Sequence, residues 1–262
     1  MMSMSVTMHP IWQSGGVILA VCVFAAMLLQ VVAHRFLPLA VRREHTALGA
    51  AIFSVIGTTY AVLLAFMATT AWAQYSAAQG LARHEADLLG SIYRASHGIA
   101  DPAGAAVRGD LMAYLMKVID VEWPAQIAGR AVPAVEPLLV HLDSTVTGLT
   151  PNGAGQSNIQ SFLISAVSDV VTVRRDRRLA THGDIPDLVW MVLLSGGGLV
   201  VAFSFVLGAP SLALHLLMTA ALAASGVLVL LLIVGLSSPF HGTVTIPPDA
   251  YAGVLAEITA AP

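Results

Sequence analysis

Charged side chains are scarce in this sequence. Asp, Glu, Lys and Arg account for 10% of its 262 residues, whereas hydrophobic residues account for 57%. A soluble domain usually carries about 25% charged residues, so the shortage indicates a membrane protein whose main partner is the lipid bilayer. With a formal net charge of −3, the chain also lacks the positive surface typical of nucleic-acid binding, so no nucleic-acid partner is expected.

Cysteine, metal-ligand patterns and catalytic motifs are scarce as well. The single cysteine, Cys22, cannot form an intramolecular disulfide, and the nine histidines show no paired metal-ligand spacing. Nucleophile-elbow, Walker and dinucleotide-binding motifs are missing. An enzyme would need a polar pocket around His84, Glu85 or Glu122, and we interpret these side chains as parts of solvated helix faces. The sequence predicts no enzyme, no metal site and no cofactor.

Long apolar runs, by contrast, are present four times, at Gly15–Ala33, Ala47–Trp72, Leu188–Leu207 and Leu212–Leu236. Each is long enough to cross a bilayer as a helix, which takes roughly 20 residues. We interpret the first as a retained span rather than a secretory signal. None of the four contains Asp, Glu, Lys or Arg, which argues against a pump or a proton-driven transporter. The short link between the last two runs predicts an antiparallel hairpin.

The segment between the second and third runs holds nearly all of the acidic residues, so it is predicted to form an extramembrane domain. Apolar residues recur there at three- to four-residue spacing, which predicts helices. The three series are Tyr75, Ala78, Ala82, Glu85, Leu89 and Tyr93, then Val107, Leu111, Leu115, Val118 and Ile119, then Ile159, Phe162, Leu163, Ala166, Val167 and Val170. Pro102 and Pro124 are predicted to break the helices before them.

These patterns predict an all-α integral membrane protein. Four transmembrane helices form two pairs, and a helical extramembrane domain lies between helices 2 and 3. The predicted parts are an N-terminal region with the first helix and an Arg-containing loop (1–46), the second helix (47–75), the helical domain (76–187), the hairpin of helices 3 and 4 (188–238) and a C-terminal turn and tail (239–262).

Orientation is predicted from arginines close to the apolar runs, because short loops rich in Lys and Arg stay in the cytoplasm. The first loop contains Arg35, Arg42 and Arg43, and the middle domain contains Arg83, Arg174, Arg175, Arg177 and Arg178. The excess predicts a cytoplasmic middle domain and cytoplasmic termini in a bacterial inner membrane.

The arginines at 174–178 have a second interpretation. Arg174 and Arg178 share a helix face, and positive charge at a pore mouth raises the local concentration of anions. Topology-setting charge is the simpler alternative, and it is favoured here.

Small residues form a stripe along the second apolar run. We call the following set the small-residue stripe: Ala51, Ser54, Thr58, Ala61, Ala65, Ala68 and Trp72. Its spacing alternates between three and four residues, and the opposite face carries bulky residues such as Ile56, Tyr60 and Leu63. Small residues let helices approach closely in lipid. The stripe is therefore either a packing seam, in this subunit or against a neighbour, or the lining of a narrow conduit in an oligomer.

The C-terminal end of the last run is a turn. Pro239 cannot continue the helix, and Gly242 permits a tight reversal. This turn, "LSSPFHG", joins three other stretches in a recognisable pattern: "GTTYAVLLAFMATTAWAQYSAAQ" with Tyr75 and then Glu85, "YLMKVIDVEW" with Glu122 and Trp123, and "RRDRRL". Together with Phe240 in the turn, these motifs resemble the bestrophin-like domain family, and they extend across most of residues 47–250.

The resemblance implies two helix pairs in the membrane and a helical cytoplasmic part. The bestrophins for which the family is named are pentameric anion channels with a pore lined by the second helix. By this likeness, the chain is expected to form a homo-oligomer that passes small anions, with the small-residue stripe around the axis. The alternative is a non-conducting membrane scaffold. It predicts a closed seam along the second helix and an exposed docking surface around Tyr93, Tyr114 and Trp123.

Overall fold

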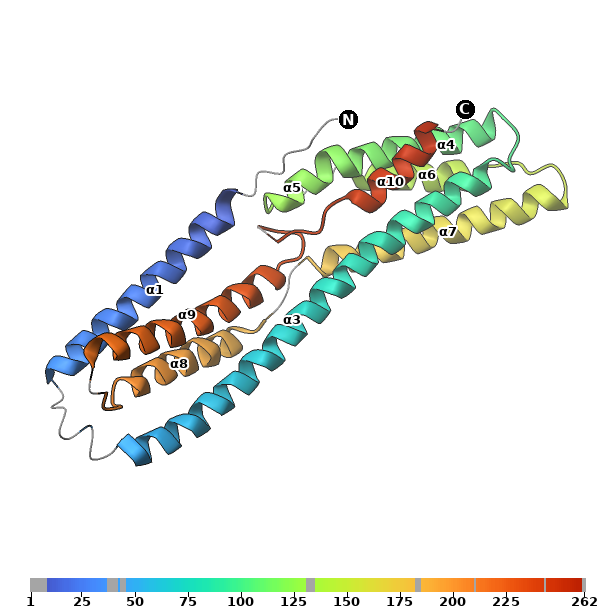
Figure 1. The fold of residues 1–262 in the computed structure, drawn as a ribbon. Coiled ribbons are helices and arrows are strands. Elements are labelled where there is room, and N and C mark those ends of the chain that lie inside the picture. The colour runs from blue at the N-terminus through green and yellow to red at the C-terminus, as the bar shows by residue number, and fades with distance from the viewer. Residues whose placement is uncertain are drawn as a thin grey trace. The chain divides into compact units, whose positions relative to one another are not determined.

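The structure is a computed structural model that describes residues 9–36, 42, 46–130, 135–181, 185–209, 211–242 and 244–260. Its helices are α1 (His9–Phe36), α3 (Thr46–Ser96), α4 (Ala103–Lys117), the π-helix η1 (Val118–Glu122), α5 (Trp123–Ile127), α6 (Glu136–Thr147), α7 (Ala154–Leu179), α8 (Asp187–Ser204), α9 (Leu212–Leu236) and α10 (Asp249–Ala260) (Figure 1). The predicted all-α fold is confirmed, and none of the described residues lies in a strand.

The chain divides into two compact units. Unit 1 comprises Met1–Ala73 and Asp184–Ser237, and unit 2 comprises Gln74–Gly183 and Ser238–Pro262. Helix α3 contributes its first part to unit 1 and its second part to unit 2.

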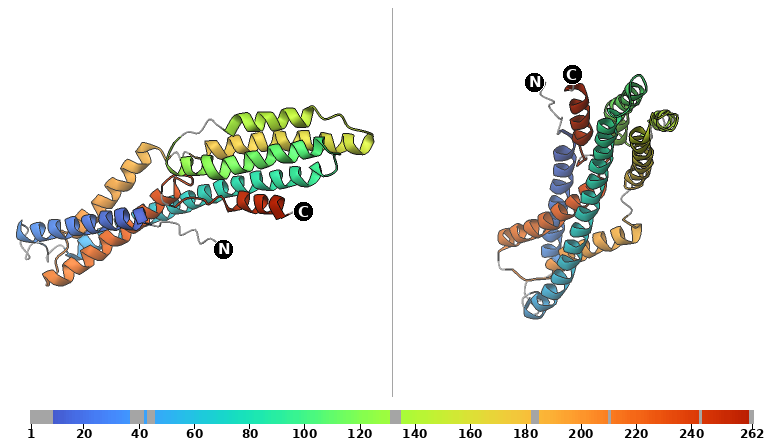
Figure 2. Two further views of the ribbon diagram at one scale, coloured as in Figure 1. Left: turned by 90° about the horizontal axis from the view of Figure 1, so that it is seen from above. Right: turned by 90° about the vertical axis from the view of Figure 1, so that its right-hand side faces the viewer.

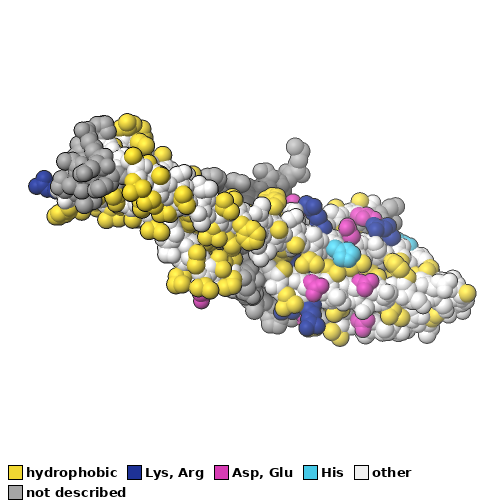
Figure 3. All heavy atoms as spheres, turned by 90° about the horizontal axis from the view of Figure 1, so that it is seen from below, with side chains coloured by type: hydrophobic (Ala, Val, Ile, Leu, Met, Phe, Trp, Pro, Cys, Tyr) yellow, Lys and Arg dark blue, Asp and Glu magenta, His cyan; other side chains and the backbone are white. Residues whose placement is uncertain are grey.

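Unit 1 contains the membrane-spanning helices. Four helical segments are long and apolar enough to cross a bilayer, namely Gly15–Phe36, Thr46–Ser96, Asp187–Ser204 and Leu212–Leu236. Within the unit, α1 packs along α9, and α8 and α9 form the predicted hairpin (Figures 1 and 2). The outward side chains are apolar, and Phe24 and Leu217 are 69% and 66% exposed. Figure 3 shows hydrophobic side chains gathered over this unit. A surface of this kind suits lipid rather than water.

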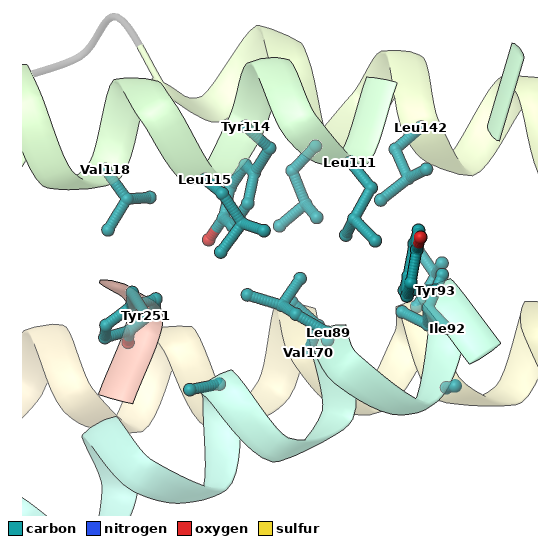
Figure 4. Close-up of a cluster of buried hydrophobic side chains, with 14 of the residues drawn as sticks. Leu89, Ile92, Tyr93, Leu111, Tyr114, Leu115, Val118, Leu142, Val170 and Tyr251 are labelled. Atoms are coloured by element: carbon teal, nitrogen blue, oxygen red, sulfur yellow. The ribbon is translucent and has the colours of Figure 1, made fainter. Parts of the chain in front are cut away.

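Unit 2 has a conventional hydrophobic core made by the second part of α3 together with α4, α6, α7 and α10. Leu89, Leu111, Leu115, Leu142 and Val170 are completely buried there and point toward one another (Figure 4). All three helical series predicted from the sequence contribute to this core, so their periodicity identified most of the buried positions. Phe162 of the third series is an exception, because its side chain is 48% exposed. Charged side chains lie over the exposed surface of this unit in Figure 3.

The predicted helix break before Pro124 is wrong. Helix α4 passes directly into the π-helix η1 and then into α5, where Pro124 occupies the first turn. A proline has no N–H to donate and clashes with the carbonyl four residues earlier. The wider turn of a π-helix relieves that clash without ending the helix. It also leaves Glu122 buried in the unit 2 interior.

Candidate functional site

The bulky side of α3 packs against α8 within unit 1. The hydroxyl of Tyr60 donates a hydrogen bond to the carbonyl oxygen of Leu193 at 2.9 Å. The Tyr60 ring lies over Gly196 and Gly197 so closely that a Cβ atom at Gly197 would lie 2.7 Å from the hydroxyl. Glycine at these positions therefore permits the close approach of α3 to α8, as small residues commonly do between membrane helices.

The small-residue stripe lies on the other side of α3. Its members Ala51, Ser54, Thr58, Ala61, Ala65 and Trp72 are exposed in the single chain, and Ala68 is half-buried. Ile56, Leu63 and Met67, on the bulky side, are half-buried instead. Among the described residues, no helix of the same subunit covers the stripe, which argues against a packing seam within one subunit. Its remaining interpretations are an axis or a neighbouring subunit.

A second exposed surface of α3 lies beside the stripe. Val55, Val62 and Phe66 are 68%, 64% and 67% exposed, and all three are bulky and apolar. On an α-helix they lie about 100° round from the centre of the stripe. Helix α3 therefore presents two adjacent exposed surfaces: one of small, weakly polar side chains and one of bulky, apolar side chains.

A cluster of buried charges is the most polar feature of unit 2. It consists of Glu85 from α3, Glu122 from η1, and Arg174 and Arg177 from α7, and we call it the Arg–Glu cluster. All four side chains are at most 3% exposed. The interpretation of Glu85 and Glu122 as parts of solvated helix faces is therefore wrong.

The cluster is held by short ion pairs. Arg177 donates from Nε to Oε2 of Glu85 at 2.7 Å and from Nη2 to Oε1 of Glu122 at 2.8 Å. Arg174 donates from Nη2 to the other Glu122 oxygen at 2.6 Å. Tyr114 bridges the remaining positions, since its hydroxyl donates to Oε1 of Glu85 at 2.7 Å and accepts from Nη1 of Arg174 at 2.9 Å. Two positive and two negative groups thus neutralise one another inside the helical unit.

Electrostatics favours the protonation states of Glu122 and Tyr114 that these contacts require. Burial alone raises the pKa of the Glu122 carboxyl, but Arg177 and Arg174 outweigh it, so this pKa lies below its ordinary value. Burial and the negative charge of Glu85 raise the pKa of Tyr114 well above its ordinary value. The tyrosine therefore stays neutral and can donate and accept at once.

The C-terminal turn closes over the same cluster within unit 2. The guanidinium carbon of Arg177 lies 5.0 Å from the ring centre of Trp123 and 6.0 Å from that of Phe240. Trp123 donates from its indole nitrogen to the carbonyl oxygen of Ile246 at 2.8 Å. Gly242 has a φ of 76°, a left-handed conformation that glycine adopts without strain. The turn that begins at Pro239 is thereby fixed against η1 and α5.

The four arginines predicted as one group are divided by the structure. Arg174 and Arg177 share the buried face of α7, whereas Arg175 and Arg178 are exposed. Arg174 and Arg178 lie one turn apart on α7, but they do not form one exposed positive surface, because Arg174 is buried and Arg178 pairs with exposed Glu136 at 2.9 Å. Sequence reasoning also missed Tyr114 as a polar partner. A signal for the buried charges was present in the sequence. Glu85 is itself a member of the first apolar series, and Arg174 lies one turn after Val170, the last member of the third series.

The docking surface predicted by the scaffold alternative is also wrong. Tyr93, Tyr114 and Trp123 are 6%, 0% and 1% exposed. Tyr75, another motif residue, is half-buried against the unit 2 core. The aromatic residues that were expected to receive a partner protein serve the interior of unit 2 instead.

The family of this chain follows from a match that covers most of its length. Residues 20–251 match the model of the bestrophin-like domain. The chain belongs to the bestrophin-like family. That match spans the membrane helices, the Arg–Glu cluster and the C-terminal turn, so the resemblance inferred from the motifs is confirmed. A comparison with curated proteins finds no match.

Solved structures of a bestrophin homologue share the fold of this chain. Two are single-substitution variants of a bacterial bestrophin homologue from Klebsiella pneumoniae. One has a TM-score of 0.72 at 14% identity, covering 92% of this chain and 98% of that chain. The other has a TM-score of 0.68 at 16% identity, covering 93% and 99%. The integral membrane fold is therefore the bestrophin fold over nearly the whole of both chains.

Proposed function

We propose that this protein is an oligomeric passive channel for small anions, with the α3 helices around a shared axis. The observation that carries the proposal is the exposure of the small-residue stripe while the bulky side of α3 packs on α8. A slim, weakly polar surface gains little from lipid contact, but it suits a narrow conduit. Membership of the bestrophin-like family supports the same arrangement, and a pentamer is proposed by analogy.

Selectivity in this proposal comes from pore width, hydroxyl groups and helix dipoles rather than from charged side chains. Ser54 and Thr58 supply hydroxyls on the stripe, and the four apolar runs identified in the sequence contain no Asp, Glu, Lys or Arg. Arg174 and Arg177 are already neutralised by carboxylates, so they contribute little attraction for anions. Of the four arginines at 174–178, only the exposed Arg175 and Arg178 are therefore available to attract anions or to set topology.

The proposed location is a bacterial inner membrane with both termini and unit 2 in the cytoplasm. Arg42 near the first loop is buried, and so are Arg174 and Arg177 in unit 2. The described arginines that stay exposed close to the spans are Arg35 at the end of α1 and Arg83, Arg175 and Arg178 in unit 2. This distribution supports the orientation predicted from the arginines near the spans.

A flux measurement with a matched pair of variants tests the proposal. Purified protein is reconstituted in liposomes, and chloride or iodide flux is compared with that of empty vesicles. Thr58→Trp places a large ring on the stripe and is expected to reduce flux at least tenfold. Thr59→Trp makes the same change about 100° round the helix, on the side of the exposed apolar residues Val55, Val62 and Phe66, and is expected to leave most of the flux.

Two results would contradict the channel. One is wild-type flux equal to that of empty vesicles. The other is equal flux through the Thr58→Trp and Thr59→Trp proteins, which would mean that the stripe does not face the conduit. The oligomeric state in mild detergent is measured alongside, because a monomer has no axis for α3 to surround.

A further inference from the structure

Arg42 is a buried arginine in unit 1 whose guanidinium is only partly bonded. Its side chain is 3% exposed, and its Nη2 donates to Nδ1 of His34 at 2.8 Å. Its backbone carbonyl accepts a hydrogen bond from the hydroxyl of Thr46 at the start of α3. The Nε and Nη1 atoms are buried and have no hydrogen-bond partner. The N–H donors of these two atoms are therefore buried without an acceptor among the described residues.

The charge of Arg42 also has no counter-charge among the residues that the structure describes. Among the residues that the structure describes, no carboxylate forms an ion pair with it, and its one side-chain partner is a histidine. In unit 2, by comparison, both buried arginines contact carboxylates. A guanidinium does not lose its proton in a protein, so it stays positively charged when buried. Buried charges normally have a counter-charge, and here the described residues supply none.

Other polar side chains of α1 and α9 lie in the same unit as Arg42. His215, near the start of α9, interacts electrostatically with Arg42 and His34. One of its ring nitrogens lies 3.0 Å from Nε2 of Gln30, and the other lies 3.1 Å from the carbonyl oxygen of Ser204. The hydroxyl of Thr219, one turn further along α9, is buried without a partner. Packing alone would not require so many polar groups on the membrane helices.

We propose that Arg42 binds a small anion inside unit 1, with chloride as the representative ligand. A water molecule could accept the free N–H donors but would leave the positive charge unbalanced, whereas an anion does both. The slight exposure of Arg42 favours a small ligand over a bulky one. The phosphate of an anionic lipid shares the required chemistry and is the other possible source. This site does not depend on the proposed conduction, because a protein can bind an anion without passing it.

Thermal unfolding of the full-length protein in zwitterionic nanodiscs tests the site. Melting temperatures are compared in sodium chloride and sodium gluconate at equal ionic strength, which separates binding from screening. With chloride about tenfold above its Kd, binding is expected to raise the wild-type Tm by roughly 3–6 °C. The Arg42→Gln variant is expected to lose this rise. Arg35→Gln removes an exposed arginine at the end of α1 and is expected to keep it.

A second measurement uses only the wild-type protein, in case Arg42→Gln does not fold. Crystals grown with bromide are expected to show an anomalous peak within hydrogen-bond distance of Nε or Nη1 of Arg42. Stabilisation by phosphatidylglycerol nanodiscs but not by chloride would assign the anion to a lipid headgroup. The proposal is overturned if neither anion source changes the wild-type Tm, if Arg42→Gln keeps the full response, or if only water is found beside Arg42. Flux is recorded separately, so loss of the site and loss of conduction are distinguishable.

Discussion

Replacing Arg177 by methionine is expected to destabilise the protein more than any exposed charge change. Arg177 is completely buried and donates to Glu85, Glu122 and Gln126 at 2.7, 2.8 and 3.2 Å. In the wild type, two guanidinium groups balance two carboxylates. The substitution leaves one guanidinium and two carboxylates, so the interior of unit 2 acquires a net charge of −1.

The magnitude follows from that imbalance. Removing one partner of a buried ion pair typically costs about 3–5 kcal/mol, because the other partner stays buried without compensation. For a chain of this length, 1 kcal/mol corresponds to about 2–4 °C, so Arg177→Met is expected to lower the Tm by roughly 6–20 °C. The assay is thermal unfolding of the full-length protein in detergent, followed by near-ultraviolet circular dichroism.

The adjacent residue supplies the matched control. Arg178 lies on the same helix and pairs with Glu136, but these two side chains are 49% and 57% exposed. Exposed pairs contribute about 0–1 kcal/mol, so Arg178→Met is expected to lower the Tm by less than about 4 °C. Adding Glu85→Gln to Arg177→Met restores charge balance and is expected to recover at least half of the lost stability. Equal effects of the two single variants, or no recovery in the double variant, would refute the reasoning.

Three further predictions follow from individual contacts. The lowered pKa of Glu122 stabilises the folded state above its ordinary value of 4.5, and this contribution is lost as pH falls through the lower folded-state pKa. Glu122→Gln is therefore expected to be less stable than the wild type at pH 7, with the difference in Tm shrinking below pH 4.5. Gly197→Ala forces the Tyr60 ring away and is expected to cost about 1–3 kcal/mol, whereas Gly198→Ala has open space and is expected to be neutral. Thr58→Cys is expected to lose flux after treatment with a bulky methanethiosulfonate reagent.

Each of these has a clear contrary result. Parallel Tm curves for the wild type and Glu122→Gln between pH 3 and 7 would show that the carboxylate charge does not stabilise the cluster. Equal Tm values for the two glycine variants would show that Tyr60 does not depend on close packing at Gly197. For Thr58→Cys, the native Cys22 is first replaced by serine, and unchanged flux after complete labelling would place this residue away from the conduit.

Much of unit 1 could be predicted from the sequence because its rules are local. A span needs about 20 apolar residues in a row, and that requirement can be read without knowing the neighbours. The four-residue link before Leu212 permits only a hairpin. The two sides of α3 also follow from residue size alone, since Tyr60 and Thr58 differ in bulk whatever surrounds them. The periodic series of unit 2 identified its core for the same reason.

The polar interior required the tertiary structure. From the sequence, Glu85 and Glu122 were predicted to face solvent, because burying an isolated carboxylate is prohibitively costly. The residues next to them in the sequence do not reveal that Arg177 neutralises both. Arg42 was interpreted as an exposed loop arginine for a similar reason, although the fold buries it. The sequence by itself determined which segments enter the membrane and which helix faces are apolar, because hydrophobic burial depends on each residue separately. Only the tertiary structure decided which charges share an interior, because the free energy of a buried charge depends on the partner that meets it there.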